Sequence, residues 1–150
     1  MANTRIQIVV QQWVIDNHLK PKYGKNFSEK NIPLSWGGKF KFDAVSDDGE
    51  IIANISTSPS HTARKKKATG KIHKIRSDTL YLTNAVGPKK RIQVFTEQSM
   101  YDDFTKQTKA GRYPNNVELD VVKLPNRLQE QVEAARKKAE DEVTPKESRK

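Results

Sequence analysis

The sequence contains no cysteine, which excludes disulfide bonds, zinc sites built on thiolates and a cysteine nucleophile. Aromatic residues make up only 7% of the chain, so most of them are needed for core packing and few remain to stack on bases. A glycine-rich phosphate loop is also missing, because Gly37-Gly38 precedes a predicted strand instead of a helix. Disulfide scaffolds, thiolate-dependent enzymes and nucleotide-binding proteins with such a loop are therefore excluded.

Long apolar runs are absent as well. No stretch approaches the roughly 18 apolar residues of a membrane span, and the first residues lack the apolar region of a signal peptide. We therefore expect no membrane association and a location in the cytoplasm or on the nucleoid.

Positive charge is what the sequence has in excess. Lys and Arg number 28 against 18 Asp and Glu, which gives a formal net charge of +10. Such a charge attracts polyanions, of which nucleic acid is the favoured candidate, with acidic proteins and anionic lipid headgroups as alternatives. The length of 150 residues fits one domain with a modest core.

Hydrophobic periodicity predicts an α/β fold in which a central mixed β-sheet is flanked by helices. Helices are expected over residues 4–19, about 60–75 and about 98–109, and a terminal helix from 126 should fray into a disordered charged tail. Strands are expected over 39–45, 50–56, 79–83, 91–96 and 117–122, whereas the polar stretch up to Asn31 is expected to be a loop or irregular edge. Residues 1–125 would form the domain, and 126–150 its C-terminal helix and tail.

A polar stripe is expected on the hairpin that joins the first two strands. The Asp48-Gly49 pair favours a two-residue turn, which fixes the register and places Asp43 directly opposite Asn54. In the same register Lys41 lies opposite Ser56. A carboxylate in an otherwise apolar strand is costly unless it is paired, bound to a metal or open to solvent. The stripe is therefore either the solvent-exposed face of the sheet or part of a site.

The segment from His61 to Arg76 contains no acidic residue. Its cations lie on the predicted helix 60–75, where they repel one another unless something anionic lies alongside. A solvated helix face is one interpretation, and a face that contacts phosphates is the other, favoured one. The candidate nucleic-acid-binding residues are His61, Arg64, Lys65, Lys66, Lys67, Lys71, Lys74 and Arg76.

These features resemble the PD-(D/E)XK nuclease superfamily, whose restriction-endonuclease-like core has a helix, a hairpin with an acid in its first strand, an acid-x-Lys second strand, a basic helix and a further strand. The resemblance covers residues 4 to about 96. Asp43 matches the first acid, and Asn54-Ile55-Ser56 falls where the family has Glu-x-Lys. The resemblance implies two carboxylates that hold Mg²⁺ and a lysine that helps to activate water.

Asn54 and Ser56 depart from this pattern, because a neutral amide replaces a carboxylate and a hydroxyl replaces an ammonium. Lys41 could supply the missing ammonium from the neighbouring strand, and Glu50 could supply a second acid. Glu50 is four residues from Asn54, however, which is about 13 Å along a strand. The candidate catalytic residues are Asp43, Lys41, Asn54 and Ser56, and the candidate metal ligands are Asp43 and Glu50.

The sequence thus predicts a nucleic-acid-binding protein with a nuclease-like domain that has lost catalysis and needs no cofactor, with DNA favoured over RNA. The first alternative is an active Mg²⁺-dependent DNA endonuclease with displaced catalytic residues. The second alternative is an interaction subunit that binds an acidic protein through its basic helix. A homodimer is left open. Asn54 and Ser56 separate the first two interpretations, and salt-sensitive DNA binding separates both from the third.

Overall fold

The computed structural model describes residues 2–62 and 65–143. Its helices are α1 (Ala2–Val14), the π-helical turn η1 (Ile15–Leu19), α2 (Lys20–Tyr23), α3 (Thr69–Asn84), α4 (Gln98–Lys109) and α5 (Asn126–Val143). Its strands are β1 (Phe27–Pro33), β2 (Lys39–Ser46), β3 (Ile51–Ser56), β4 (Lys90–Phe95) and β5 (Glu118–Val121).

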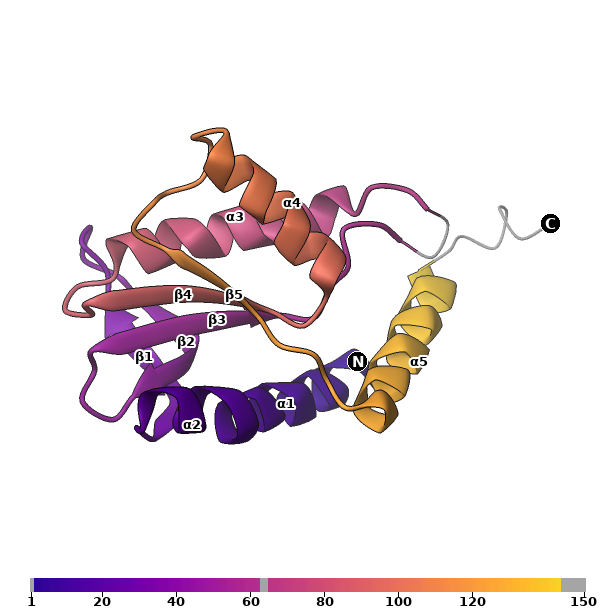
Figure 1. Ribbon diagram of the computed structural model, residues 1–150, viewed down its shortest axis with the longest axis horizontal. Coiled ribbons are helices and arrows are strands. Elements are labelled where there is room, and N and C mark those ends of the chain that lie inside the picture. The colour runs from indigo at the N-terminus through magenta and orange to yellow at the C-terminus, as the bar shows by residue number, and fades with distance from the viewer. Residues whose placement is uncertain (1, 63–64, 144–150) are drawn as a thin grey trace.

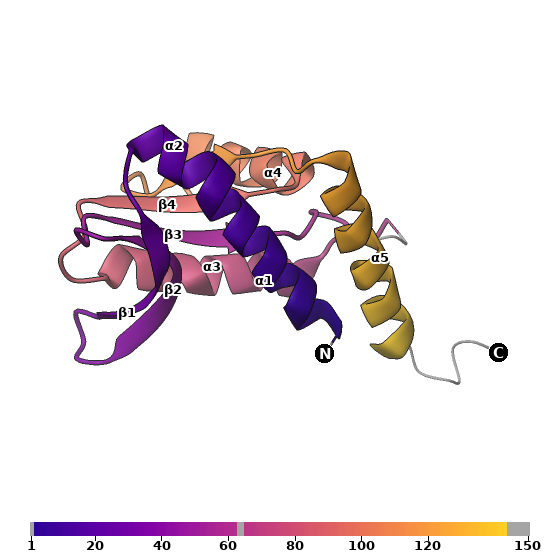
Figure 2. The same ribbon diagram turned by 90° about the horizontal axis from the view of Figure 1, so that it is seen from below.

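The strands form a five-stranded mixed sheet in the order β1-β2-β3-β4-β5. The first three strands pair antiparallel, and β3, β4 and β5 pair parallel. Helices α1 and α2 cover one face of the sheet and α3 and α4 cover the other, while α5 lies beside the N-terminal half of α1 (Figures 1 and 2). The predicted α/β fold with a mixed sheet flanked by helices is therefore confirmed.

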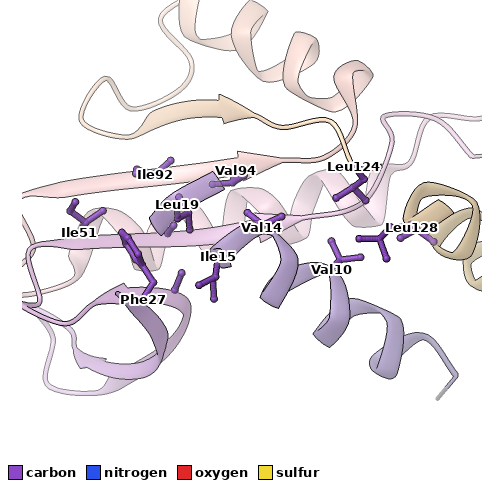
Figure 3. Packing of buried hydrophobic residues seen from close by; sticks show 13 residues of the cluster. Val10, Val14, Ile15, Leu19, Phe27, Ile51, Ile92, Val94, Leu124 and Leu128 are labelled. Carbon is purple, nitrogen blue, oxygen red and sulfur yellow. The ribbon is translucent and has the colours of Figure 1, made fainter. Parts of the chain in front are cut away.

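Two hydrophobic cores lie on opposite faces of the sheet because side chains alternate along each strand. The first core joins α1, the sheet and α5; Val10, Val14, Leu19, Ile92 and Leu128 are among its buried residues (Figure 3). The second core fills the space between the sheet and helices α3 and α4. Helix α5 is part of the fold through Leu128 and Val132, which are both buried in the first core.

Sequence periodicity locates several elements within a few residues. The Asp48-Gly49 hairpin has the predicted register, since Ala44 pairs with Ala53 and Val45 with Ile52. Strands β3, β4 and β5 and helix α4 lie where they were expected, and α5 begins at Asn126 as predicted. Residues 137–143, which were assigned to the predicted tail, belong to α5, and the rest of that tail, 144–150, lies outside the described residues. In the described part of the chain, no helix combines the length and apolar character that crossing a bilayer requires.

The stretch before Asn31 is a strand and not the predicted loop or irregular edge. Strand β1 is the outermost strand of the sheet, and Phe27 is its only fully buried residue. A polar edge strand with one solvated face and one unpaired side carries little of the apolar alternation that identifies buried strands. That is why the sequence did not indicate it.

The predicted helix 60–75 and strand 79–83 are both wrong. Helix α3 begins only at Thr69 and continues to Asn84, so it includes the whole predicted strand. Its buried residues Ile75, Thr79 and Leu82 follow helical spacing. Cations in the first turn of a helix face the positive end of its dipole, and Lys65, Lys66 and Lys67 lie before the start of α3. The described residues of the basic segment that precede α3, 61–62 and 65–68, instead form a loop, in which His61 and Lys67 make an isolated β-bridge.

Candidate functional site

A β-bulge in β2 sets the position of Asp43. Ser28 pairs with Val45 and Lys30 with Phe42, so two residues of β2, Asp43 and Ala44, face a single residue of β1. A bulge bends its strand and redirects a side chain. The pairing of β2 with β3 accordingly includes Ala44 and Val45 but stops before Asp43.

The Asp43 side chain turns toward β3. Its Oδ2 accepts a hydrogen bond from the backbone N–H of Ile55 at 2.8 Å. In return, the backbone N–H of Asp43 donates to Oδ1 of Asn54 at 3.4 Å. Asp43 and Asn54 are therefore neighbours, as the hairpin register indicated, but they are joined through backbone groups and not by two side chains aimed at one point.

Asp43 opens into a cavity of about 140 Å³ at the carboxyl end of β3. Helices α1 and α3 form its walls, and the residues that follow β3 form its floor. The cavity is lined by Gln7, Gln11, Asp43, Ile55, Ser56, Thr57, Ser58, Lys71, Lys74, Ile75 and Asp78. It thus brings together two carboxylates, two lysines and several hydroxyls.

Burial raises the pKa of Asp43 to about 6, against the opposing effects of the Ile55 hydrogen bond and the positive charge of Lys74. The negative charges of Asp78 and Glu29 act in the same direction as burial. Asp43 is thus an acid whose charge changes between mildly acidic and neutral pH, a behaviour common at functional sites.

Two of the candidate residues lie elsewhere. Lys41 is exposed and its ammonium pairs with Oε1 of Glu29 at 2.9 Å, because β2 bends away from β3 at the bulge and carries Lys41 with it. Glu50 pairs with Lys25 and Lys89, before the start of β3. The expectation that Lys41 replaces the missing ammonium is therefore wrong, and so is the pairing of Glu50 with Asp43 as metal ligands.

Lys71 and Lys74 are the lysines that line the Asp43 cavity. The sequence marked both as phosphate contacts, but nothing in it placed them beside Asp43. Asp78 was not predicted at all, although its spacing from Lys74 is typical of a helical ion pair; the two side chains lie 2.9 Å apart. Among residues 2–62 and 65–143, no group of three His, Asp or Glu side chains is arranged to hold a metal ion.

Strands β3 and β4 contain unpaired buried polar groups close to this cavity. Asn54 pairs in register with Gln93 of β4, and both side chains are buried. Within the described residues, the Asn54 amide nitrogen and the Gln93 amide oxygen have no hydrogen-bond partner. An unpaired buried donor or acceptor costs about 1–3 kcal/mol. The buried Asn54 amide therefore lowers the stability of the fold at a position next to Asp43, whose backbone N–H it accepts.

The cations of the predicted basic helix are divided between a loop and α3. Lys65, Lys66 and Lys67 are exposed in the loop, and Lys65 has a left-handed backbone with a φ of 62°. Arg64 lies outside the described residues. His61 is exposed, and its Nδ1 lies 2.8 Å from Oγ of Ser60.

The cations on α3 face in two directions. Lys71 and Lys74 line the Asp43 cavity. Arg76 turns to α4, where it donates to Oε1 of Gln107 at 3.1 Å and lies over the ring of Phe104. A second cavity of about 290 Å³ lies there, and Lys67, Arg76 and Lys106 are among its lining residues. Lys106 was not identified from the sequence, since helix α4 contains acids as well as lysines.

Fold and site together define an α/β protein with a mixed sheet and an acid–lysine cavity at the carboxyl end of its central strand, flanked by a basic loop. Comparison with protein-family models, with curated proteins and with solved structures finds no match to the chain.

Proposed function

We propose that the protein binds nucleic acid by its phosphate backbone, through the loop lysines and the first half of α3. One observation carries this proposal. Lys65, Lys66, Lys67 and Lys71 are exposed, and none forms an ion pair with a carboxylate whose side chain the structure describes. Clustered lysines that lack acidic partners are the electrostatic footprint of phosphate binding.

The position of these lysines supports the proposal. They follow β3, which is the first of the three parallel strands, and in open α/β sheets ligands bind in the crevice beyond the carboxyl ends of the strands. The PD-(D/E)XK resemblance implies a helix, an antiparallel hairpin, a basic helix and a further strand. The chain has α1, the β2–β3 hairpin, α3 and β4 in that order, with β1 inserted before the hairpin and most of the basic residues before α3. Because restriction endonucleases act on DNA, we favour DNA over RNA as the partner.

Binding without cleavage is the function that the residues around Asp43 favour. Mg²⁺ is usually held by one or two carboxylates, and a nuclease also needs a group that activates water. Asn54 offers only an amide, and the carboxylate of Asp78 is already paired with Lys74. Among the described side chains that line the cavity, Asp43 is therefore the single carboxylate available for a metal ion.

Mg²⁺-dependent phosphodiester hydrolysis is a second candidate, favoured by the two lysines that line the cavity with Asp43. Asp43 would hold the ion, which would supply an activated water, and Lys71 would stabilise charge on the phosphate. Incubation of plasmid DNA with the protein and MgCl₂ tests this candidate. Cleavage that Asp43→Ala abolishes would establish it, and intact plasmid would leave binding as the function.

The binding proposal is tested by the salt dependence of DNA affinity. Lys65→Gln, Lys66→Gln and Lys67→Gln combined should reduce the slope of log affinity for duplex DNA against log salt by up to about three, because each phosphate contact contributes about one. The control combines Lys30→Gln, Lys39→Gln and Lys89→Gln, which removes the same charge from exposed lysines. These three belong to β1, to the start of β2 and to the turn before β4, outside the basic loop and α3.

The control variant should retain the slope of the unmodified protein. If both triple variants lost the same amount, net charge and not this loop would attract the DNA. An unchanged slope in the loop variant would refute the assignment of the loop. A protein that binds no DNA but captures an acidic protein would support the interaction-subunit alternative instead.

A further inference from the structure

A groove of about 340 Å³ lies between α1, α5 and the residues that follow β3. Its walls are apolar: Ile6 and Val10 come from α1, and Val132 and Ala135 come from α5. Pro59 adds to the apolar lining. Pockets of a few hundred cubic ångströms with apolar walls and a few polar groups are typical of small-ligand sites.

Basic side chains line one part of this apolar groove. Lys71, His61 and Arg136 line it, and the described residues of its lining include no acid. The Arg136 guanidinium is held in place, because it donates to the backbone oxygen of Thr57 at 2.9 Å and lies 3.4 Å from a Glu97 oxygen. The Lys71 ammonium has no such ion pair among the described side chains. A matching ligand therefore has a flat or compact apolar part and an anionic group beside Lys71.

The groove continues into the Asp43 cavity. Gln7, Thr57, Ser58 and Lys71 line both spaces. The Lys71 side chain thus stands where the apolar groove meets the cavity in which a phosphate would lie. The hydroxyls of Thr57 and Ser58 and the amide of Gln7 are hydrogen-bonding groups at the same junction.

We propose that this groove binds an unpaired nucleobase, so that the protein prefers single-stranded DNA or single-stranded ends to a continuous duplex. This inference rests on the proposed nucleic-acid binding and adds the form of nucleic acid that is recognised. A base enters the groove while its phosphate lies against Lys71. In a duplex the base is stacked and paired, so it reaches such a pocket only after the energy of unstacking is supplied.

Ligands with and without bases test the inference on the unmodified protein. The probes are a fluorescent oligothymidylate, an abasic strand of the same length and charge, and a blunt duplex, compared by fluorescence anisotropy at one salt concentration. The oligothymidylate should bind about tenfold more tightly than the abasic strand, because burial of one base against aliphatic side chains removes enough apolar surface from water to contribute about that factor. Equal affinity for the two strands would overturn the inference, and so would tighter binding of the duplex.

Replacement of either of two alanines of α5 by phenylalanine tests whether the base binds in this groove. Ala135→Phe fills the groove, whereas the neighbouring Ala134 is exposed and lies outside the residues that line it. Ala135→Phe should remove the tenfold preference for the strand that has bases, and Ala134→Phe should retain it. A folded Ala135→Phe protein that keeps the preference would overturn the inference. The comparison of the two strands stands even if Ala135→Phe fails to fold.

The outcomes separate this inference from the proposed function. Salt-dependent binding of all three probes with no dependence on bases would leave phosphate-backbone binding intact and remove the base pocket. Failure to bind any probe would refute both.

Discussion

Oδ2 of Asp43 accepts the backbone N–H of Ile55, so the strand that follows the hairpin turn is joined to a carboxylate of the strand before it. The hydrogen bond lies at the point where β2 and β3 cease to pair as a ladder. A carboxyl group there also accepts this hydrogen bond in its neutral form, although the bond favours the charged form, and burial outweighs that preference. The negative charge of Asp43 is therefore not required for folding.

Asp43→Asn is expected to stabilise the protein at pH 8 and not at pH 4. The pKa of Asp43 is raised from 3.8 to about 6, so the folded state binds its proton more tightly than the unfolded state does. The contribution of Asp43 to the free energy of unfolding therefore falls as the pH rises from about 4 to about 6, and it stays low above that range. The difference between the two ends of this range is about 3 kcal/mol. Asparagine retains the acceptor without the charge.

Urea denaturation at the two pH values measures this effect. Asp47→Asn is the matched control, since Asp47 is an exposed aspartate next to the same hairpin turn; its stability should change by less than about 0.5 kcal/mol. Equal stability of Asp43→Asn and the unmodified protein at pH 8 would show that the carboxylate is well solvated.

Lys74→Gln and Asp78→Asn should shift the pKa of Asp43 in opposite directions. Lys74 lowers this pKa and Asp78 raises it, so Lys74→Gln should raise the pKa above 6 and Asp78→Asn should lower it. Titration of the side-chain carboxyl carbon by NMR gives both values. Two shifts of the same sign would contradict the opposite effects assigned to Lys74 and Asp78.

Asn54→Glu combined with Ser56→Lys should increase the affinity for Mg²⁺. The double variant restores the acid-x-Lys pattern beside Asp43, and hard cations bind carboxylate oxygens far better than an amide. Isothermal titration calorimetry measures the gain. Asn31→Glu with Ser28→Lys makes the same chemical change at exposed positions of β1 and should bind Mg²⁺ no better than the unmodified protein. A folded restored variant without any gain would argue against the nuclease resemblance.

Leu128→Ala should destabilise the protein by about 2 kcal/mol, the lower end for loss of a buried leucine side chain, because Leu128 is buried against α1. The exposed neighbour Gln131 is the control, and Gln131→Ala should have little effect. Thermal denaturation followed by circular dichroism compares the two. Similar melting temperatures for both variants would mean that α5 contributes nothing to the core.

Truncation after Ala139 should leave the melting temperature nearly unchanged. Among the α5 side chains that the structure describes, the buried ones, Leu128 and Val132, lie in its first half, and residues that bury little apolar surface contribute little stability. Calorimetry of the truncated chain checks this. A loss of several degrees would show that the last residues are docked on the domain.

The hairpin was predictable because two local signals agreed. The Asp48-Gly49 turn and the alternation in its flanking strands fixed the register, and these two signals alone were enough to place Asp43 beside Asn54. The bulge could not be predicted, because it is an extra residue relative to the partner strand β1, and the sequence did not indicate that strand. Lys41 was misplaced for the same reason.

Helix α3 shows a different limit. Residues 79–83 include Leu80, Tyr81 and Leu82, an apolar run short enough to be mistaken for a strand. They are instead the end of a helix whose buried residues Ile75, Thr79 and Leu82 follow helical spacing. The Ser-Pro-Ser signal before the basic segment indicated a helix start that its charges do not allow. The role of Lys71 and Lys74 as neighbours of Asp43 depends on tertiary packing, which no local pattern in this sequence carries.

The bulge makes Asp43 an extra residue in the alternating pattern of β2. Phe42 and Val45 lie in the same core although they are three positions apart, which a regular strand with a repeat of two does not permit. Without Asp43 the remaining sequence Phe42-Ala44-Val45 alternates regularly, with the same side chains facing each core. Asp43 is thus a single inserted residue that the sheet accommodates but does not need. Deletion of Asp43 would test whether the sheet still folds when the carboxylate of the site is removed.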